Sequence, residues 1–287
     1  MDLPDIAADP AVQDLVRRAL EEDVGPGDAT TLSLVADARQ IEAAILARED
    51  CVVSGTDVAG AVFTAVSPDV TCEVLIRDSG RAAPDARILL VRGPARAILT
   101  GERTALNFMQ RMTGIATLTR RFVDRVAAHG TTVLDTRKTT PTLRKLEKYA
   151  VLCGGGQNHR MGLYDRVMIK DNHRRLCKGR QTLGLEEAVR AARQRYPDLA
   201  VEVEVETEAE LAHALRARPD WVLFDNLPPA RLKPFVEACG EGVRTEASGG
   251  LTLDTVEAVA ATGVDAVSLG CLTHSAPSTD LSLEICA

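Results

Sequence analysis

Six apolar segments of this sequence each end in polar or small residues of the kinds that bind and transform small molecules. The segments are VLDTRK, VMIKDNH, VEVEVE, WVLFDN, TEASGG and VSLG, in that order along residues 133–270. If each segment is a strand of one parallel sheet, all six ends lie at the same edge of that sheet. The sequence therefore predicts a single site at this edge.

The candidate site residues fall into three chemical sets. The cations are Arg137, Lys138, Arg160 and Lys170, with His159 as an additional candidate. The acids are Glu204 and Asp225. The small residues are Ser248, Gly249, Gly250, Ser268 and Gly270.

Each set suits a particular kind of ligand. Arginine grips a carboxylate through two parallel hydrogen bonds, and lysine suits a phosphate or pyrophosphate. Glu204 and Asp225 can hold Mg²⁺ directly or through water, or pair with the lysines when the site is empty. Small residues after the last two strands of a barrel commonly bind phosphate, although a tight turn gives the same pattern. Together the sets indicate one ligand with carboxylates and another with several phosphates and Mg²⁺.

Other chemistries have less support among these residues. A lysine at a barrel strand end can form a Schiff base, as in class I aldolases, but Lys138 and Lys170 would each have cationic neighbours. The motifs G-x-S-x-G, H-E-x-x-H and G-x-x-x-x-G-K-[ST] do not occur in the sequence. The residues favour an enzyme that joins an anionic acid to a phosphorylated substrate by stabilising charge.

Composition narrows the class of protein. The chain has 287 residues, 45% of them hydrophobic and 3% aromatic, and its formal net charge is −7. Few aromatics argue against a base-stacking nucleic-acid surface, and the acidic balance argues against binding to DNA or an anionic membrane. Residues 135–178, however, contain 11 Lys and Arg but only 4 Asp and Glu, which indicates a local pocket for a small anion.

Cysteine usage and the N-terminal segment bear on where the protein works. The seven cysteines lack C-x-x-C spacing and match neither a disulfide framework nor a zinc site. The segment MDLPDIAADP lacks the features of a signal peptide, and no apolar stretch approaches 18 residues. We therefore expect a cytoplasmic protein with no nucleic-acid or membrane partner.

The periodicity of apolar residues predicts the elements that position the site. Residues 1–24 have helical spacing, and residues 40–98 contain short strand-like runs around a helix at 57–66, typical of a small α/β domain with a partly antiparallel sheet. A long helical stretch follows at 101–129. The later strands alternate with helices, which predicts parallel βα units forming a barrel of six or seven strands. These helices are expected at 185–196, 208–218, 229–239 and 253–261.

Three long motifs in the middle of the chain are highly specific. They are GERTALNFMQRMTGIAT at 101–117, DTRKTTPTLR at 135–144 and EKYAVLCGGGQNHRMGLYDRVMIKDNH at 147–173. EEDVGPGDATT precedes them, and VEVEVET, FDNL, EASGG and VDAVSLGCLTHS follow in order. Together these segments extend over nearly the whole chain and resemble quinolinate phosphoribosyltransferase (nicotinate-nucleotide pyrophosphorylase, carboxylating).

The resemblance implies a glycosyltransferase of de novo NAD biosynthesis. It would transfer phosphoribosyl from 5-phosphoribosyl 1-pyrophosphate to quinolinate with decarboxylation, giving nicotinate mononucleotide, pyrophosphate and CO₂. Mg²⁺ is the implied cofactor, and no organic cofactor is expected, because the ribosylated ring nitrogen is itself an electron sink. The implied fold is an N-terminal α/β sandwich domain at 1–115 and an incomplete six- or seven-stranded α/β barrel at 116–275. The C-terminal tail, 276–287, would pack back on the first domain.

The resemblance also implies roles for individual residues. The catalytic set is Lys138, Lys170, Glu204 and Asp225. The quinolinate ligands are Arg103, Thr136, Arg137, Lys138, His159, Arg160 and Lys170. The phosphoribosyl pyrophosphate ligands are Lys138, Lys170, Glu204, Asp225, Ser248, Gly249, Gly250, Ser268 and Gly270, and the metal ligands are Glu204 and Asp225, directly or through water. Arg103 would reach into the site of a neighbouring subunit, in a homodimer or a dimer-based hexamer.

Several alternatives stay open from the sequence. A related phosphoribosyltransferase would act on another aromatic acid such as nicotinate, and a paralogue encoded with molybdate transport genes is a further alternative. A class I aldolase-like barrel would use Lys170 as a Schiff base. A non-catalytic sensor of phosphorylated ligands would keep the barrel without the chemistry, although the complete set of cations and acids argues against it.

Overall fold

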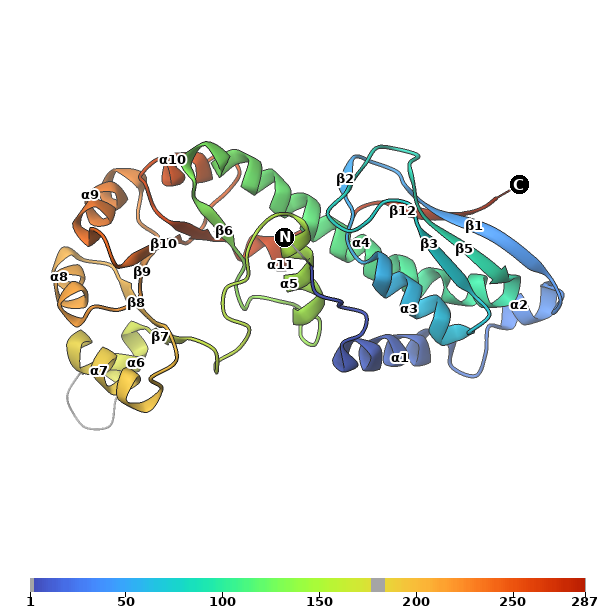
Figure 1. The fold of residues 1–287 in the computed structure, drawn as a ribbon, viewed down its shortest axis with the longest axis horizontal. Coiled ribbons are helices and arrows are strands. Elements are labelled where there is room, and N and C mark those ends of the chain that lie inside the picture. The colour runs from blue at the N-terminus through green and yellow to red at the C-terminus, as the bar shows by residue number, and fades with distance from the viewer. Residues whose placement is uncertain (1–2, 177–183, 287) are drawn as a thin grey trace. The chain divides into compact units, whose positions relative to one another are not determined.

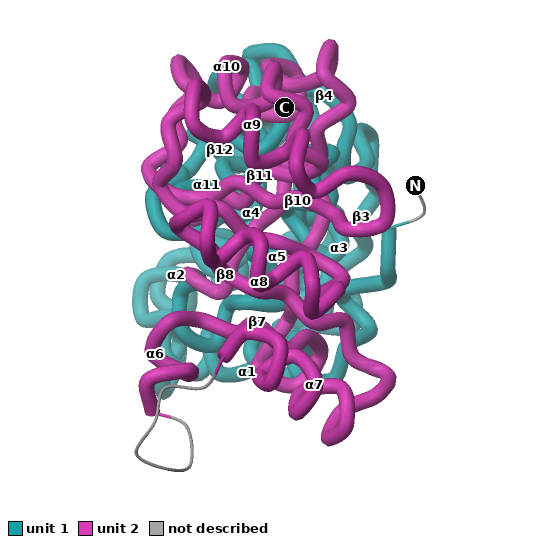
Figure 2. Tube along the Cα trace, turned by 90° about the vertical axis from the view of Figure 1, so that its left-hand side faces the viewer, with its two compact units in different colours: residues 1–120, 139–156, 271–287 teal, residues 121–138, 157–270 magenta. Residues whose placement is uncertain are grey.

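The computed structural model describes residues 3–176 and 184–286. The chain forms two compact units (Figure 1, Figure 2). By residue number, the first comprises Met1–Arg120, Thr139–Gly156 and Cys271–Ala287, and the second comprises Arg121–Lys138 and Gln157–Gly270. Three separate parts of the chain thus build the first unit.

A four-stranded antiparallel sheet belongs to the first unit. Its strand order is β12-β1-β5-β3, with β1 at Gln40–Ala47, β3 at Thr71–Val74, β5 at Arg87–Pro94 and β12 at Leu281–Ile285. Two short strands, β2 at Cys51–Val52 and β4 at Arg81–Ala82, pair separately. All these pairs are antiparallel, which confirms the predicted sheet over residues 40–98 and adds β12 to its edge beside β1.

The helices of the first unit begin at chemically recognisable positions. They are α1 at Pro10–Val24, α2 at Ala29–Leu34, α3 at Thr56–Val66, α4 at Ala95–Val126, α5 at Arg144–Cys153 and α11 at Cys271–His274. Asp9 caps α1 by accepting from the N–H of Ala11, and Asp28 caps α2 by accepting from the N–H of Thr31. The long α4 starts directly after Pro94, earlier than the predicted start at residue 101, because proline is tolerated before a helix but not inside it. Its last residues, from Arg121, belong to the second unit.

The second unit is built on six parallel strands. Their order is β6-β11-β10-β9-β8-β7, with β6 at Thr132–Leu134, β7 at Val167–Ile169, β8 at Val201–Val205, β9 at Trp221–Asp225, β10 at Arg244–Ser248 and β11 at Ala266–Ser268. Every neighbouring pair is parallel. Within the described part of the chain, β6 and β7 do not pair with each other, so the sheet is an open barrel, as predicted.

Helices cover the outer face of this sheet (Figure 1). They are α6 at Asp171–Arg175, α7 at Leu185–Arg195, α8 at Glu208–Ala217, α9 at Pro229–Cys239 and α10 at Val256–Ala260. In β8 the buried valines 201, 203 and 205 alternate with Glu202 and Glu204. Because successive side chains of a strand point to opposite faces, the two glutamates share the face opposite the valines.

Three further expectations from the sequence concern the domain boundaries, membrane-spanning helices and the cysteines. The predicted domain boundaries, after residues 115 and 275, stay a prediction, and the compact units group residues 139–156 with the first unit. No helix among the described residues combines the length and apolar character needed to cross a membrane. Six cysteines are free thiols, while Cys177 and the rest of the basic stretch at 177–180 lie outside the described residues.

Candidate active site

The carboxyl ends of the parallel strands bring predicted site residues of the second unit together. Asp225 at the end of β9 is in register with Ser248 at the end of β10, and Ser248 is in register with Ser268 on β11. β8, which carries Glu204, pairs with the other side of β9. Lys170 comes directly after β7, at the edge of the sheet beside β8. This edge is where parallel α/β folds place their chemistry.

Lys170 and Glu204 form an ion pair between Nζ and Oε2. The Glu204 side chain is 11% exposed, whereas that of Lys170 is 42% exposed. The N–H of Lys170 also donates to Nδ1 of His173 at 3.0 Å, which fixes the backbone of Lys170 at the start of α6. The pair therefore places an accessible ammonium against a largely buried carboxylate.

A tight turn after β10 lies against Asn226. Gly249 and Gly250 have φ angles of +101° and +59°, in the region that favours glycine. A Cβ at Gly249 would lie 2.2 Å from Oδ1 of Asn226. Asn226 in turn donates from Nδ2 to Oδ2 of Asp225 at 3.0 Å and from its N–H to the carbonyl of Ser248 at 2.8 Å. Asn226 can hold Asp225 and the turn together only because residue 249 lacks a side chain.

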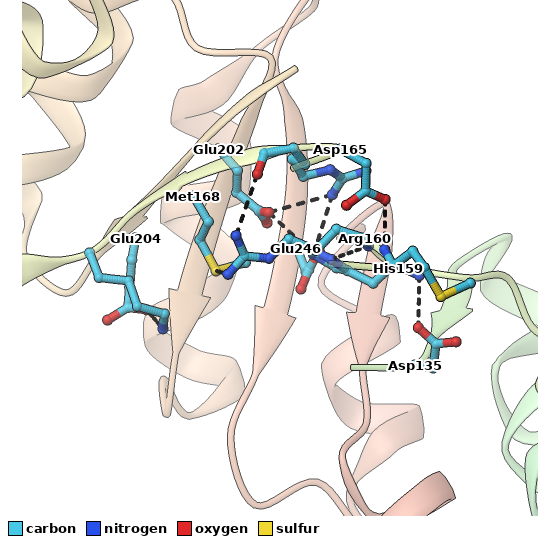
Figure 3. Close-up of polar contacts among 11 residues, drawn as sticks. Asp135, His159, Arg160, Asp165, Met168, Glu202, Glu204 and Glu246 are labelled. Carbon is cyan, nitrogen blue, oxygen red and sulfur yellow. Dashed lines mark hydrogen bonds and ion pairs between the residues drawn. The ribbon is translucent and has the colours of Figure 1, made fainter. Parts of the chain in front are cut away.

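Arg160 carries a guanidinium that forms no ion pair with a carboxylate of the described chain. Its amino groups donate to the main-chain oxygen of Arg166 at 3.4 Å and to Sδ of Met168 at 3.5 Å (Figure 3). Burial and the nearby positive charge of Arg137 lower the pKa of Arg160. The Arg160 guanidinium, which lies near a second arginine and forms no ion pair of its own with a described carboxylate, is suited to an anionic ligand.

The turn after β6 presents the other predicted cations. Arg137 is half-buried, and Lys138 is exposed. The N–H of Lys138 donates to Oγ1 of Thr136 at 3.0 Å, so Thr136 shapes the backbone on which both cations stand. Arg103, in contrast, lies on α4 in the first unit, where its side chain is exposed.

His159 is buried, with 7% of its surface exposed. Its N–H donates to Oδ1 of Asp135 at 2.8 Å, and its Nδ1 accepts from the N–H of Arg160 at 2.7 Å (Figure 3). Its Nε2 lies 3.2 Å from Oε2 of Glu202 and 3.3 Å from Oε2 of Glu246.

The proton distribution in this group follows from burial and hydrogen bonding. Burial works to lower the pKa of His159, but hydrogen bonds to Glu202 and Glu246 raise that pKa to about 9. Burial and the charge of Glu202 also raise the pKa of Glu246. Because Nδ1 accepts from the N–H of Arg160, the ring proton that the two glutamates stabilise lies on Nε2.

Two family models match this chain. The C-terminal domain of quinolinate phosphoribosyl transferase matches residues 115–284, and its N-terminal domain matches residues 28–113. The chain belongs to the quinolinate phosphoribosyl transferase family. The match to the C-terminal domain contains all the predicted site residues except Arg103, which falls in the match to the N-terminal domain.

Individual relatives in this family are similar over most of their length. The probable nicotinate-nucleotide pyrophosphorylase [carboxylating] of Bacillus subtilis is 42% identical over 265 residues, covering 92% of this chain and 90% of that protein. Quinolinate phosphoribosyltransferase [decarboxylating] 1 of Nicotiana glauca is 40% identical, covering 94% of this chain and 81% of that protein. The solved structure of the nicotinate-nucleotide pyrophosphorylase from Francisella tularensis has a TM-score of 0.91 at 36% identity, covering 99% of this chain and 100% of that chain.

In this member of the quinolinate phosphoribosyl transferase family, three residues that were not predicted from the sequence adjoin the predicted site. Glu202, Glu246 and Arg166 surround the ring of His159, with Nη1 of Arg166 3.3 Å from its Nε2. A signal for the two glutamates was present, because each stands two residues before a predicted site residue, Glu204 or Ser248, and so shares its face of the strand.

Proposed function

We propose that this chain transfers phosphoribosyl from 5-phosphoribosyl 1-pyrophosphate to quinolinate with decarboxylation, giving nicotinate mononucleotide, pyrophosphate and CO₂. The observation that carries the proposal is the cluster of cations and acids at the carboxyl ends of one parallel sheet. Family membership supports the reaction, since relatives are named for quinolinate phosphoribosyl transfer and for the carboxylating pyrophosphorylase reaction.

Quinolinate carries two neighbouring carboxylates on a pyridine ring. Arg160 forms no ion pair with a carboxylate of the described chain and lies close enough to Arg137 for their charges to interact, so a substrate carboxylate bound at Arg160 would compensate its charge. Lys138 and Lys170 add charge at the same edge of the sheet, and Thr136 holds the turn that carries Lys138. These residues form the proposed quinolinate pocket, together with Arg103 from a second copy of the chain.

The phosphoribosyl donor needs groups that stabilise opposite charges during transfer. As the bond between ribose C1 and pyrophosphate breaks, the ribose gains positive charge and the bond's electron pair stays with pyrophosphate, while the ring nitrogen forms a bond to C1. Glu204 and Asp225 would stabilise the ribose, and Lys138 and Lys170 the pyrophosphate. The turn at Ser248, Gly249 and Gly250, with Ser268 and Gly270, would bind the 5-phosphate through main-chain N–H groups.

The carboxylates of Glu204 and Asp225 also fit Mg²⁺. They come from adjacent strands, and Asn226 fixes one oxygen of Asp225, which gives a small set of oxygen ligands. Mg²⁺ bound there, directly or through water, would neutralise the pyrophosphate charge.

Decarboxylation needs no organic cofactor in this scheme. Once the ring nitrogen is ribosylated, its positive charge accepts the electron pair released when the neighbouring carbon–carboxylate bond breaks. CO₂ leaves, and the ring carbon takes up a proton. The protein's contribution would be to hold the second carboxylate through Arg137 and Arg160.

We also propose that the enzyme works in the cytoplasm as a homodimer or a dimer-based hexamer. Arg103 is exposed on α4, in a different compact unit from the proposed pocket. In such an assembly, the exposed guanidinium of Arg103 would bind quinolinate in the pocket of a second copy of the chain.

The reaction can be tested by following both products. Purified protein with quinolinate, 5-phosphoribosyl 1-pyrophosphate and Mg²⁺ is expected to release nicotinate mononucleotide and CO₂ in equal amounts. Nicotinate in place of quinolinate has no second carboxylate to lose, so mononucleotide without CO₂ from nicotinate alone would indicate the related transferase. Borohydride trapping of a substrate on Lys170 would instead support an aldolase, although Lys170 is engaged with Glu204 and a Schiff base requires a free amine.

A further inference from the structure

A buried polar cluster of the second unit includes Glu202 and Glu246, which stand two residues before Glu204 and Ser248 on their strands. It consists of His159, Glu202 on β8, Glu246 on β10 and Arg166 just before β7. The side chains of His159, Glu202 and Glu246 are 5%, 0% and 1% exposed. Figure 3 shows these three side chains directed toward one another. The proposed reaction assigns no role to either glutamate or to Arg166.

Both ring nitrogens of His159 contact other groups of the same chain. Nδ1 accepts the N–H of Arg160 at 2.7 Å, and Nε2 faces the carboxylates of Glu202 and Glu246 at 3.2 and 3.3 Å. The backbone is also held, since the N–H of His159 donates to the fully buried Asp135. The ring therefore has no nitrogen left to offer a substrate carboxylate.

Arg166 closes the cluster on the side of Glu202. Its Nη1 lies 3.4 Å from Oε2 of Glu202 and 3.3 Å from Nε2 of His159. Its guanidinium also stacks on Trp221, 5.0 Å from the ring centroid, which fixes the guanidinium from a second direction. A buried carboxylate is costly unless it is paired, so the position of Glu202 depends on both His159 and Arg166.

We infer that His159 is a positioning residue: Glu246 and Glu202, which Arg166 holds in place, fix its ring, and the ring fixes the main chain of Arg160, so that the Arg160 guanidinium is held ready for a substrate carboxylate. This inference rests on the proposed function for the identity of the acid. It revises the expectation from the sequence that His159 itself contacts quinolinate. Glu202 and Glu246 thereby become positioning residues too, acting through His159.

The same three side chains also carry ligand atoms for a metal ion, which all lie within 4.8 Å of one another. Arg166, however, already supplies positive charge to this group, at hydrogen-bonding distance from both His159 and Glu202. We therefore assign the cluster to positioning. Metal analysis of the purified protein belongs to the test, and one bound metal per chain that is lost in Glu246→Gln would overturn the assignment.

The test is a thermodynamic cycle on quinolinate binding, measured by titration calorimetry. His159→Gln keeps an amide near the carboxylates but removes the acceptor at Nδ1, whereas His159→Asn keeps an acceptor near Nδ1. We expect His159→Gln and Glu246→Gln each to weaken quinolinate binding by about 10-fold or more, because the positions of contacting groups must hold to within about 1 Å. His159→Asn, which keeps the acceptor but loses the contacts with Glu202 and Glu246, should lose less affinity than His159→Gln, and the KM for the phosphoribosyl donor should stay within about 2-fold in all three.

The decisive measurement is quinolinate binding by double variants that combine each substitution with Arg160→Ala. If His159 acts through Arg160, adding His159→Gln or Glu246→Gln to Arg160→Ala costs little further affinity. Additive losses would overturn the inference, because a direct ligand contributes whether or not Arg160 is present. Trp221 fluorescence, which reports the packing of Arg166 and Arg244 on the indole, checks that each variant is folded. If His159→Gln does not fold, Glu246→Gln provides the test.

Failure of the proposed function is recognised separately. Protein that binds quinolinate but forms no nicotinate mononucleotide contradicts the reaction, while the binding cycle still decides the role of His159. Product formation together with an additive cycle contradicts only the inference.

Discussion

Gly249 is the residue on which the geometry of the phosphate turn depends most directly. An added Cβ would approach Oδ1 of Asn226 to 2.2 Å, and the φ of +101° is strained for any other residue. We expect Gly249→Ala to displace Asn226, and with it Asp225, and to raise the KM for the phosphoribosyl donor by about 10-fold or more. Steady-state kinetics with the donor varied measures this.

A matched control separates collision from backbone strain. Gly240 also has a positive φ, +59°, but a Cβ there would meet nothing within 4 Å. Gly240→Ala should leave the KM for the donor unchanged. An equal rise in both variants would mean that general destabilisation, and not Asn226, explains the effect.

Lys138 is exposed, so its removal should leave the fold intact. In the proposed reaction its ammonium stabilises the departing pyrophosphate. We expect Lys138→Ala to lower kcat by about 100-fold to 1,000-fold, the usual effect of losing one group that stabilises transition-state charge. Single-turnover product formation measures this, and near-normal turnover would remove Lys138 from the mechanism.

The site residues differ in how far the sequence could predict them. Glu204 and Asp225 could be predicted because each ends an apolar strand, and strand ends of a parallel sheet converge. The partners of His159 could not be predicted, since Glu202 and Glu246 come from strands that are not neighbours in the sheet and meet only through its curvature. Burial of the His159 ring depends on the same long-range contacts.

Among the elements of the first unit, α4, α5 and the segment after α11 are joined by one ion pair. Arg111 on α4 donates to Oε1 of Glu147 on α5 at 2.8 Å, and also to the carbonyl of Ala276 at 2.9 Å. Glu147 is fully buried and also accepts from the N–H and hydroxyl of Thr140, at 3.0 and 2.8 Å. One carboxylate thus satisfies donors from two separate chain segments.

Glu147→Gln should therefore destabilise α5. Removing one member of a buried ion pair leaves an uncompensated charge, which costs about 3 kcal/mol. Hydrogen exchange of the α5 amides measures the local free energy of opening and should fall by about this amount. Glu186→Gln removes the partner of Arg216 in an exposed pair and should cause no measurable change.

Periodicity predicted the repeating elements better than the irregular ones. The four helices α7 to α10 lie close to their predicted ranges because each alternates with a short apolar strand. The helix α5 was not predicted, although Leu146, Tyr149 and Ala150 form a buried helical face. Its distinctive polar residues, such as Glu147, make long-range contacts whose partners the local sequence does not reveal.

The whole molecule is expected to function as an assembly of copies. We expect Arg103→Ala to raise the KM for quinolinate by about 10-fold or more, since it removes a charge-assisted hydrogen bond to a carboxylate. Mixing Arg103→Ala chains with Lys170→Ala chains should restore activity, because one of the two pockets in a mixed dimer then has both residues. Product formation against mixing ratio measures this.

Samples that contain only one of the two variants provide the control for that experiment. Arg103→Ala chains mixed only with Arg103→Ala chains, and Lys170→Ala chains mixed only with Lys170→Ala chains, should show no recovery. Absence of recovery in the mixed sample, once mass spectrometry has shown that mixed dimers form, would mean that Arg103 serves its own chain.

The pairing of β1 with β12 has a consequence for how the protein is made. The second unit lies between these two strands in the chain, so a ribosome completes all of its strands before β12 emerges. Until then, the outer edge of β1 offers unpaired N–H and C=O groups to any other extended chain. The nascent protein therefore has a vulnerable period that lasts at least as long as the synthesis of its barrel, whatever the rate at which the barrel folds.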